Sequence, residues 1–223
     1  MRLQSRRKLF DIEVFQGKCV VFNTESAYWY LKCVNYKNYV DSCDNIFIDG
    51  IGIALKLFGY HGFSRRYHGP DLLYDILNFS QFSSMNLVLL GGSTLEPKVL
   101  KKLNIDAQII LPYTDSVETL FEHTIQHEHT LKNSILLISL GLPKQELLAH
   151  RLSGQMDTLK INSIIPVGAA IDFVVGTKRR SGYFWRLIGL EWLPRLIREP
   201  RMFKRVFKSV KGLYLFKSDC ITK

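Results

Sequence analysis

The stretch Ser134–Glu146, SILLISLGLPKQE, joins an apolar run to a Gly-Leu-Pro turn and then to a helix-like pattern. The run is apolar almost throughout instead of alternating with polar residues. This is typical of a strand buried on both faces, as in a parallel sheet covered by helices. Similar runs occur elsewhere in the chain, at Lys18–Phe22, Asn45–Ile48, Asn86–Leu90, Ala107–Leu111 and Asn162–Val167.

Helix-like patterns separate these apolar runs. They cover Ser26–Asn35, Ile51–Phe58, Asp71–Phe79, Glu96–Leu103, Ser116–His127 and Lys144–Leu152. Regular alternation of strands and helices is the α/β pattern. We therefore predict a Rossmann-like, doubly wound and mostly parallel sheet that forms one core over residues 1–177.

Charge separates this core from the end of the chain. Residues 1–177 carry 17 Lys and Arg against 17 Asp and Glu, whereas residues 178–223 carry 13 against 3. Helix-like segments over Gly182–Ile188, Leu190–Arg198 and Pro200–Phe216 place basic residues beside an apolar face. We therefore predict a basic, amphipathic helical appendage over residues 178–223, with an anionic partner.

The basic appendage could bind either of two anionic partners, a membrane surface or a diphosphate. A basic helix with aromatic side chains lies well on an anionic membrane surface, and its arginines could also close over a site and bind a diphosphate. No apolar stretch is long enough to span a membrane, and the basic N-terminus is not followed by an apolar segment typical of a signal peptide. We expect a cytoplasmic protein attached peripherally to the inner face of the cell membrane.

The cysteines and histidines do not predict a metal or redox site. The four cysteines have no Cys-x-x-Cys spacing. His123 and His127 could share one helix face, but His129 would point elsewhere, so the cluster is more typical of a solvated helix surface. We expect no metal and no cofactor.

Several polar residues follow the ends of predicted strands, where ligands bind in open α/β sheets. Asp49 follows Asn45–Ile48, and its carboxylate could act as a general base or simply cap the helix that begins at Ile51. Asp172 could accept hydrogen bonds from a ribose or a uracil ring, or could be an ordinary acid of a first helical turn. The turn at Gly91-Gly92 is too short for the dinucleotide fingerprint, which disfavours an NAD-dependent enzyme.

Five short motifs resemble the WecG/TagA/CpsF family of bacterial glycosyltransferases from about Asn23 to about Arg205. They are DGIG at 49–52, the Arg66-x-x-Gly69-x-Asp71 pattern, GLPKQE at 141–146, VGAAIDF at 167–173 and GLEWLPRL at 189–196. The resemblance implies Asp49 as the catalytic base. It also implies donor contacts by Arg66, Gln145 and Asp172, where a surface arginine and a capping Gln-Glu pair are the alternatives. The match of Asn23 and Thr24 to the family's sugar-contact segment is looser, and Arg180 precedes Ser181-Gly182 where the family commonly has Ala-Pro.

The resemblance further implies the reaction. It is a metal-independent, inverting transfer of a sugar, such as N-acetylmannosamine or its uronic acid, from a UDP-sugar in cell-envelope polysaccharide synthesis. The acceptor is a polyprenyl-diphosphate-linked sugar, such as N-acetylglucosamine, and Arg195, Arg198 and Arg201 would neutralise charge on the departing UDP. Relatives often form homo-oligomers, so self-association is a further expectation. The alternative from the residues is a non-enzymatic protein whose basic tail binds nucleic acid or membrane. The tail aromatics fall on an apolar helix face, which favours membrane binding or packing within the protein over nucleic-acid binding.

Overall fold

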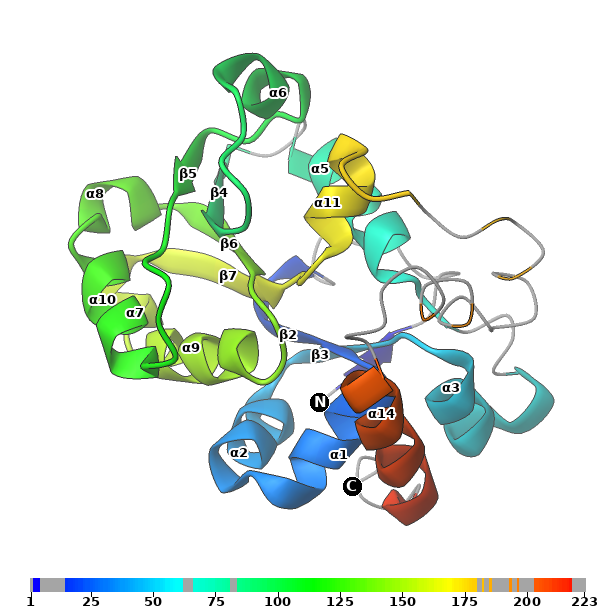
Figure 1. Cartoon of the computed structure of the whole chain (residues 1–223). Helices are drawn as coiled ribbons and strands as arrows, with labels where there is room; N and C mark the ends of the chain where they lie inside the picture. The colour runs from blue at the N-terminus through cyan, green and yellow to red at the C-terminus, as the bar shows by residue number, and fades with distance from the viewer. Residues whose placement is uncertain are drawn as a thin grey trace.

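The computed structural model describes residues 2–4, 15–61, 66–80, 84–179 and 203–217, together with residues 182, 185, 193 and 196. Seven parallel strands form one sheet in the order β1-β3-β2-β7-β6-β4-β5 (Figure 1). Their bounds are β1 Arg2–Gln4, β2 Gly17–Phe22, β3 Asn45–Ile48, β4 Asn86–Gly91, β5 Ala107–Ile109, β6 Ser134–Ser139 and β7 Ile161–Pro166. The predicted α/β, Rossmann-like fold is confirmed.

Helices cover both faces of this sheet. They are α1 Thr24–Lys32, α2 Val34–Ser42, α3 Ile51–Phe58, α5 Gly69–Ser80, α6 Pro97–Lys102, α7 Val117–Ile125, α8 Glu128–Leu131, α9 Lys144–Ser153, α10 Met156–Leu159, α11 Ala170–Val175 and α14 Phe203–Leu215, with a short 3₁₀ helix, η3, at Gly59–His61. Most lie on one face with α1, α2 and α9, whereas α5 and α11 pack against the opposite face.

Each central strand contributes side chains to two separate cores. In β6, Leu136 and Ile138 pack with the helices of the first face, whereas Ile135 and Leu137 pack with α5 and α11 on the other. Successive side chains of a strand point to opposite faces, so a strand covered on both sides needs an apolar residue at every position. This is the physical origin of the continuous apolar runs in the sequence.

Most predicted element bounds agree with the structure, but the helices α2, α8, α10 and α11 were not predicted, and two further local features differ. The predicted helix Ser26–Asn35 corresponds to α1, which ends at Lys32 because Cys33 adopts an extended backbone (φ −129°, ψ 113°) before α2 begins. The strand β1 was not predicted, since its three residues form no apolar run and it pairs only with the edge of β3. Neither difference changes the centre of the sheet.

The centre of the sheet contains a topological switch point between β2 and β7. These strands are neighbours, but the chain leaves β2 for α1 on one face and leaves β7 for α11 on the other. Loops that diverge in this way open a crevice at the carboxyl ends of the strands, which is where ligands bind in this class of fold.

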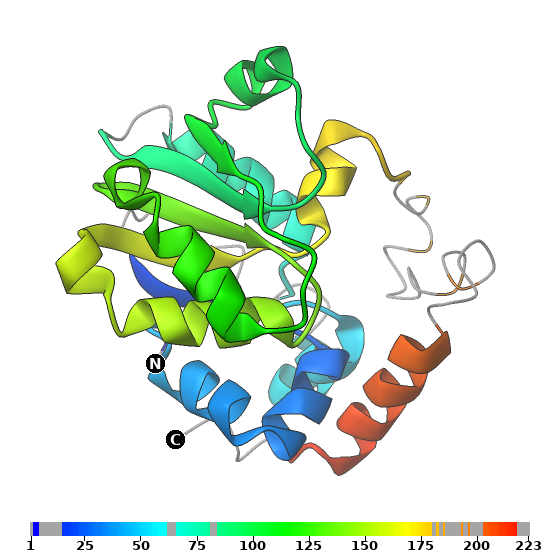
Figure 2. The ribbon, with the colours of Figure 1, turned by 60° about the vertical axis from the view of Figure 1, so that its left-hand side comes forward.

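The C-terminal helix α14 packs along α1 (Figures 1 and 2). Gly212 allows this approach, because a Cβ atom there would lie only 2.4 Å from the backbone oxygen of Thr24. Beyond the helix, Phe216 is buried against the rings of Phe22 and Tyr30. The Lys56 ammonium donates to the Phe216 carbonyl oxygen at 2.7 Å. The end of the predicted appendage therefore contributes to the core of the N-terminal part.

Candidate active site

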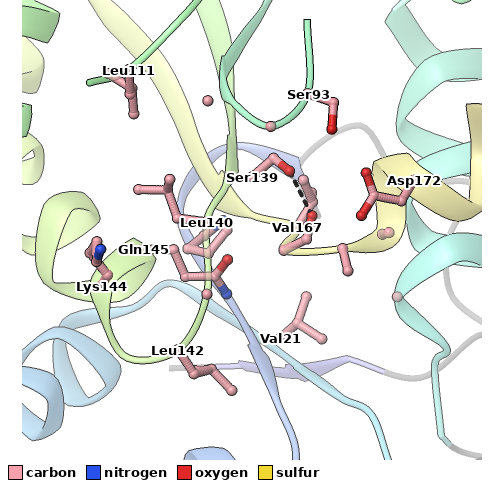
Figure 3. A pocket seen from close by; sticks show the side chains of 18 of the residues that line it. Val21, Ser93, Leu111, Ser139, Leu140, Leu142, Lys144, Gln145, Val167 and Asp172 are labelled. Atoms are coloured by element: carbon pink, nitrogen blue, oxygen red, sulfur yellow. Dashed lines mark hydrogen bonds between the residues drawn. The ribbon is translucent and has the colours of Figure 1, made fainter. Parts of the chain in front are cut away.

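A cavity of about 650 Å³ lies at the carboxyl edge of the sheet. Residues that line it follow six of the strands, and Figure 3 shows a close view. Among the predicted site residues, Asn23, Asp49, Gln145 and Asp172 line this cavity. Residues that the sequence places up to about 150 positions apart therefore share one space.

Asp49 is held at the end of β3 by its own backbone. Its N–H donates to the Phe22 carbonyl oxygen at 2.9 Å, and its side chain is 29% exposed. Nδ1 of His68 lies 3.8 Å from the Asp49 carboxylate. The capping alternative does not fit, since Gly50 is the N-cap of α3 and that helix end has no side-chain capping bond. The carboxylate is therefore placed at the cavity rather than used to begin a helix.

Asn23 both caps α1 and lines the cavity. Its Oδ1 accepts from the backbone N–H groups of Glu25 at 2.9 Å and of Ser26 at 3.0 Å, which satisfies two free donors of the first turn. The adjacent Thr24 is not among the lining residues and lies at the contact with α14. Asn23 therefore lies at the cavity, whereas Thr24 lies outside its lining.

Gln145 lies in the first turn of α9, and its amide points into the cavity (Figure 3). Its Nε2 donates to Oε1 of Glu146 at 2.7 Å, whereas its own Oε1 has no hydrogen-bond partner among the described residues. The helix has no side-chain capping bond, so the capping reading of this Gln-Glu pair is wrong. One acceptor atom of Gln145 is therefore buried in the wall of the cavity without a hydrogen-bond partner among the described residues.

Asp172 faces the cavity from the opposite side, in the first turn of α11 (Figure 3). Its Oδ2 accepts from the ammonium of Lys178 at 2.6 Å, and Lys178 also lines the cavity. Between these groups, Gly91 and Gly92 form a turn with φ values of +75° and +78°, which only glycine adopts without strain. This turn brings a bare backbone to the cavity wall, as phosphate-binding turns do.

Two further cations line the cavity, and the sequence analysis did not include them among the site residues. The ammonium of Lys144 donates to the Thr114 carbonyl oxygen at 2.6 Å and to the Asp115 carboxylate at 2.7 Å. The guanidinium of Arg205, on α14, donates from Nε to the buried carboxylate of Glu25 at 2.8 Å. Arg205 does belong to the basic series of the tail, so its charge was visible, but its ion pair depends on how α14 packs on α1.

The sequence model of the glycosyl transferase WecG/TagA/CpsF family matches residues 10–222. The chain belongs to this family. It is therefore a glycosyltransferase of cell-envelope polysaccharide synthesis, which acts on a sugar donor and an acceptor. Membership of this family favours the glycosyltransferase over the two alternatives, a non-enzymatic binding protein and an NAD-dependent enzyme.

Of the remaining expected residues of this glycosyltransferase, the structure describes Arg66 but not the three tail arginines. Arg66 is buried and is therefore not a surface arginine, but it is not among the lining residues. Arg195, Arg198 and Arg201 lie outside the residues that the structure describes. No helix in the described part of the glycosyltransferase is long and apolar enough to cross a membrane.

The histidine cluster spans two helices: His123 lies in α7, His127 is the N-cap of α8 and His129 lies in α8. The rings of His123 and His127 lie 5.2 Å apart, and Nδ1 of His127 lies 3.0 Å from the His123 carbonyl oxygen. Over residues 15–61, 66–80, 84–179 and 203–217, no three His, Cys, Asp or Glu side chains gather closely enough to hold one metal ion. The cavity described above thus remains the candidate active site.

Proposed function

We propose that this glycosyltransferase moves a sugar from a UDP-sugar to a polyprenyl-diphosphate-linked sugar, with inversion and without a metal ion. N-acetylmannosamine or its uronic acid is the proposed donor sugar, and N-acetylglucosamine the proposed acceptor sugar. One observation carries the proposal: a carboxylate, Asp49, opens on the same cavity as acceptor groups and cations suited to a nucleoside diphosphate.

The donor would lie across the switch point of the sheet. The Asp172 carboxylate suits the hydroxyls of a ribose or the N–H of a uracil ring, as acids at strand ends do in dinucleotide folds. Lys178 and Lys144 would face the diphosphate. The turns that follow β4 at Gly91 and β6 at Gly141 would supply backbone N–H groups. By resemblance, Arg66 and Gln145 complete the donor contacts, and Asn23 and Thr24 those to sugar or acceptor.

The reaction is a single displacement at the anomeric carbon. Asp49 removes the proton of the acceptor hydroxyl, whose oxygen forms a bond to the anomeric carbon as the bond to the β-phosphate oxygen breaks. UDP leaves with the electron pair from the opposite face, so the configuration inverts. Arg205 and, by resemblance, Arg195, Arg198 and Arg201 would stabilise the charge on UDP, which is the role a metal ion has in other enzymes.

Calorimetry tests the donor site. UDP should bind the full-length protein in the presence of EDTA, and Asp172→Asn should weaken this binding by about tenfold, the loss of one charge-assisted hydrogen bond. Asp157→Asn is the matched control, since Asp157 lies in α10 and is not among the cavity residues. Equal binding by the Asp172 variant and the wild type would remove Asp172 from the site.

We further propose that α14 attaches the protein to an anionic membrane. Its face away from α1 carries the exposed side chains Phe203, Phe207, Val210 and Tyr214. Lys204, Lys211 and Lys217 are exposed in the same segment, whereas Lys208 lies over the Trp29 ring of α1. The sequence has no acid from Phe203 to Lys217. Basic residues near an anionic surface contribute about 1 kcal/mol each, so this segment supports reversible attachment.

Sedimentation with vesicles tests this attachment. The protein should pellet with phosphatidylserine-containing vesicles, should be released from them at high salt, and should not bind neutral vesicles. Phe207→Ser combined with Val210→Ser should reduce the bound fraction several-fold, because the apolar contribution is lost. Val34→Ser, on an equally exposed apolar residue of α2, should bind as the wild type does. Equal loss in all variants, or no preference for anionic lipid, would contradict the proposal.

A further inference from the structure

A carboxyl group lies directly behind the cavity, and the mechanism above does not use it. Glu146 is fully buried, in the first turn of α9, and is not among the cavity residues. Its Oε1 accepts from Nε2 of Gln145 at 2.7 Å, and its Oε2 has no hydrogen-bond partner among the described residues. Buried charges in proteins are normally paired, so an acid with one open oxygen requires an explanation.

The surroundings of Glu146 favour its neutral form. Glu25 approaches from α1, but its carboxylate is already paired with Arg205. Tyr36 and Tyr39 approach from α2, where the Tyr36 hydroxyl has no hydrogen-bond partner in the described structure. Among the residues that the structure describes, Glu146 makes no ion pair. Burial raises the pKa of the Glu146 carboxyl to about 8, although hydrogen bonds from the Gln145 side chain and from the Glu146 backbone act in the opposite direction; the negative charge of Glu25 adds to the rise.

We propose that Glu146 is a positioning residue, whose neutral carboxyl holds the Gln145 amide so that Gln145 Oε1 accepts an N–H or O–H group of the donor. Because Nε2 is engaged with Glu146, the amide cannot rotate without breaking that bond, and the buried Oε1 stays beside Gly168 in the cavity wall. The loop at Gly168 leaves room for it, since a Cβ atom there would lie 3.3 Å from Gln145 Oε1. The inference rests on the proposed function, because the group bound is part of the UDP-sugar.

The neutral form has a second consequence for an anionic donor. A charge on Glu146 would lie behind the wall of the cavity that receives the diphosphate. For two unit charges about 10 Å apart, an effective dielectric constant of about 20 gives a repulsion that corresponds to about tenfold in affinity. Donor binding should therefore weaken as the pH rises through the titration of Glu146, and Glu146→Gln should remove that dependence while it keeps an acceptor for Gln145 Nε2.

Two measurements test the inference, the first without any ligand. In protein labelled with ¹³C at the glutamate carboxyls, the resonance that disappears in Glu146→Gln should titrate with a midpoint near pH 8. A midpoint below about pH 6 would mean that the carboxyl is charged at neutral pH and would overturn the proposal. This readout does not depend on whether UDP-sugars bind.

The second measurement is calorimetric binding of UDP-N-acetylglucosamine, whose diphosphate does not titrate in this range, at pH 6.5 and pH 8.8. The wild type should bind about tenfold more weakly at the higher pH, and Glu146→Gln should bind about equally at both. Glu146→Ala, which removes the partner of Gln145, should bind about tenfold more weakly at both pH values. The same pH dependence in Glu146→Gln and the wild type would overturn the proposal.

The two possible failures are distinguishable. Absence of binding by the wild type at either pH would reject the UDP-sugar site, and the positioning role would fall with it. A glutamate resonance that titrates near pH 8 alongside pH-independent donor binding would keep the neutral carboxyl and reject its role toward the donor.

Discussion

Asp49→Asn should lower the rate of sugar transfer by about 10²–10⁴-fold, the usual contribution of a general base. Asparagine keeps the size and the hydrogen-bonding capacity of the side chain but cannot take a proton. The backbone N–H of residue 49 would still donate to Phe22, so the end of β3 should not move. UDP should bind the variant nearly as well as the wild type, because the proposed role of Asp49 is toward the acceptor. The comparison requires initial rates and calorimetry on the same preparations.

Asp44→Asn is the matched control for this experiment. Asp44 precedes β3 directly, at the amino end of the same strand, where its Oδ2 accepts from the backbone N–H of Lys18 at 2.8 Å. Because Asp44 lies at the amino edge of the sheet, away from the cavity, Asp44→Asn should keep the wild-type rate of sugar transfer. Retained turnover in Asp49→Asn would contradict the assignment of Asp49 as the catalytic base. Loss of UDP binding in this variant would instead indicate that Asp49 contacts the donor.

Phe216→Ala should lower the free energy of unfolding by about 3–5 kcal/mol. The side chain is fully enclosed, with its ring centroid 5.6 Å from that of Phe22 and 6.2 Å from that of Tyr30. Its removal leaves a cavity between α14, α1 and β2. A chain that ends at Thr177 would lose the same contacts, so point variants are a better way to examine the tail. Denaturant unfolding measures the change.

Tyr214→Ala provides the comparison within the same segment. Tyr214 is 84% exposed on α14, so its removal should change the free energy of unfolding by no more than about 0.5 kcal/mol. Equal stability of the two variants would show that α14 does not dock on α1 in solution. In that case the ion pair between Arg205 and Glu25 could not hold Arg205 at the cavity.

The sequence predicted the part of the site that parallel strands determine. Asp49, Gln145 and Asp172 each follow a strand, and the carboxyl ends of parallel strands meet at one edge, so their convergence follows from periodicity and order alone. Arg205 and Lys178 reach the cavity through packing of the C-terminal segments, which no local pattern encodes. The burial of Glu146 was also beyond the sequence, because a Glu in a first helical turn is ordinarily a solvated or capping acid.

Formation of the lipid-linked disaccharide in EDTA tests the central claim most directly. Full-length protein, UDP-N-acetylmannosamine and a prenyl-diphosphate-linked N-acetylglucosamine should give the disaccharide of inverted configuration, with one UDP released for each sugar transferred. Absence of the disaccharide with these substrates, or its formation only after a divalent metal ion is added, would contradict the account.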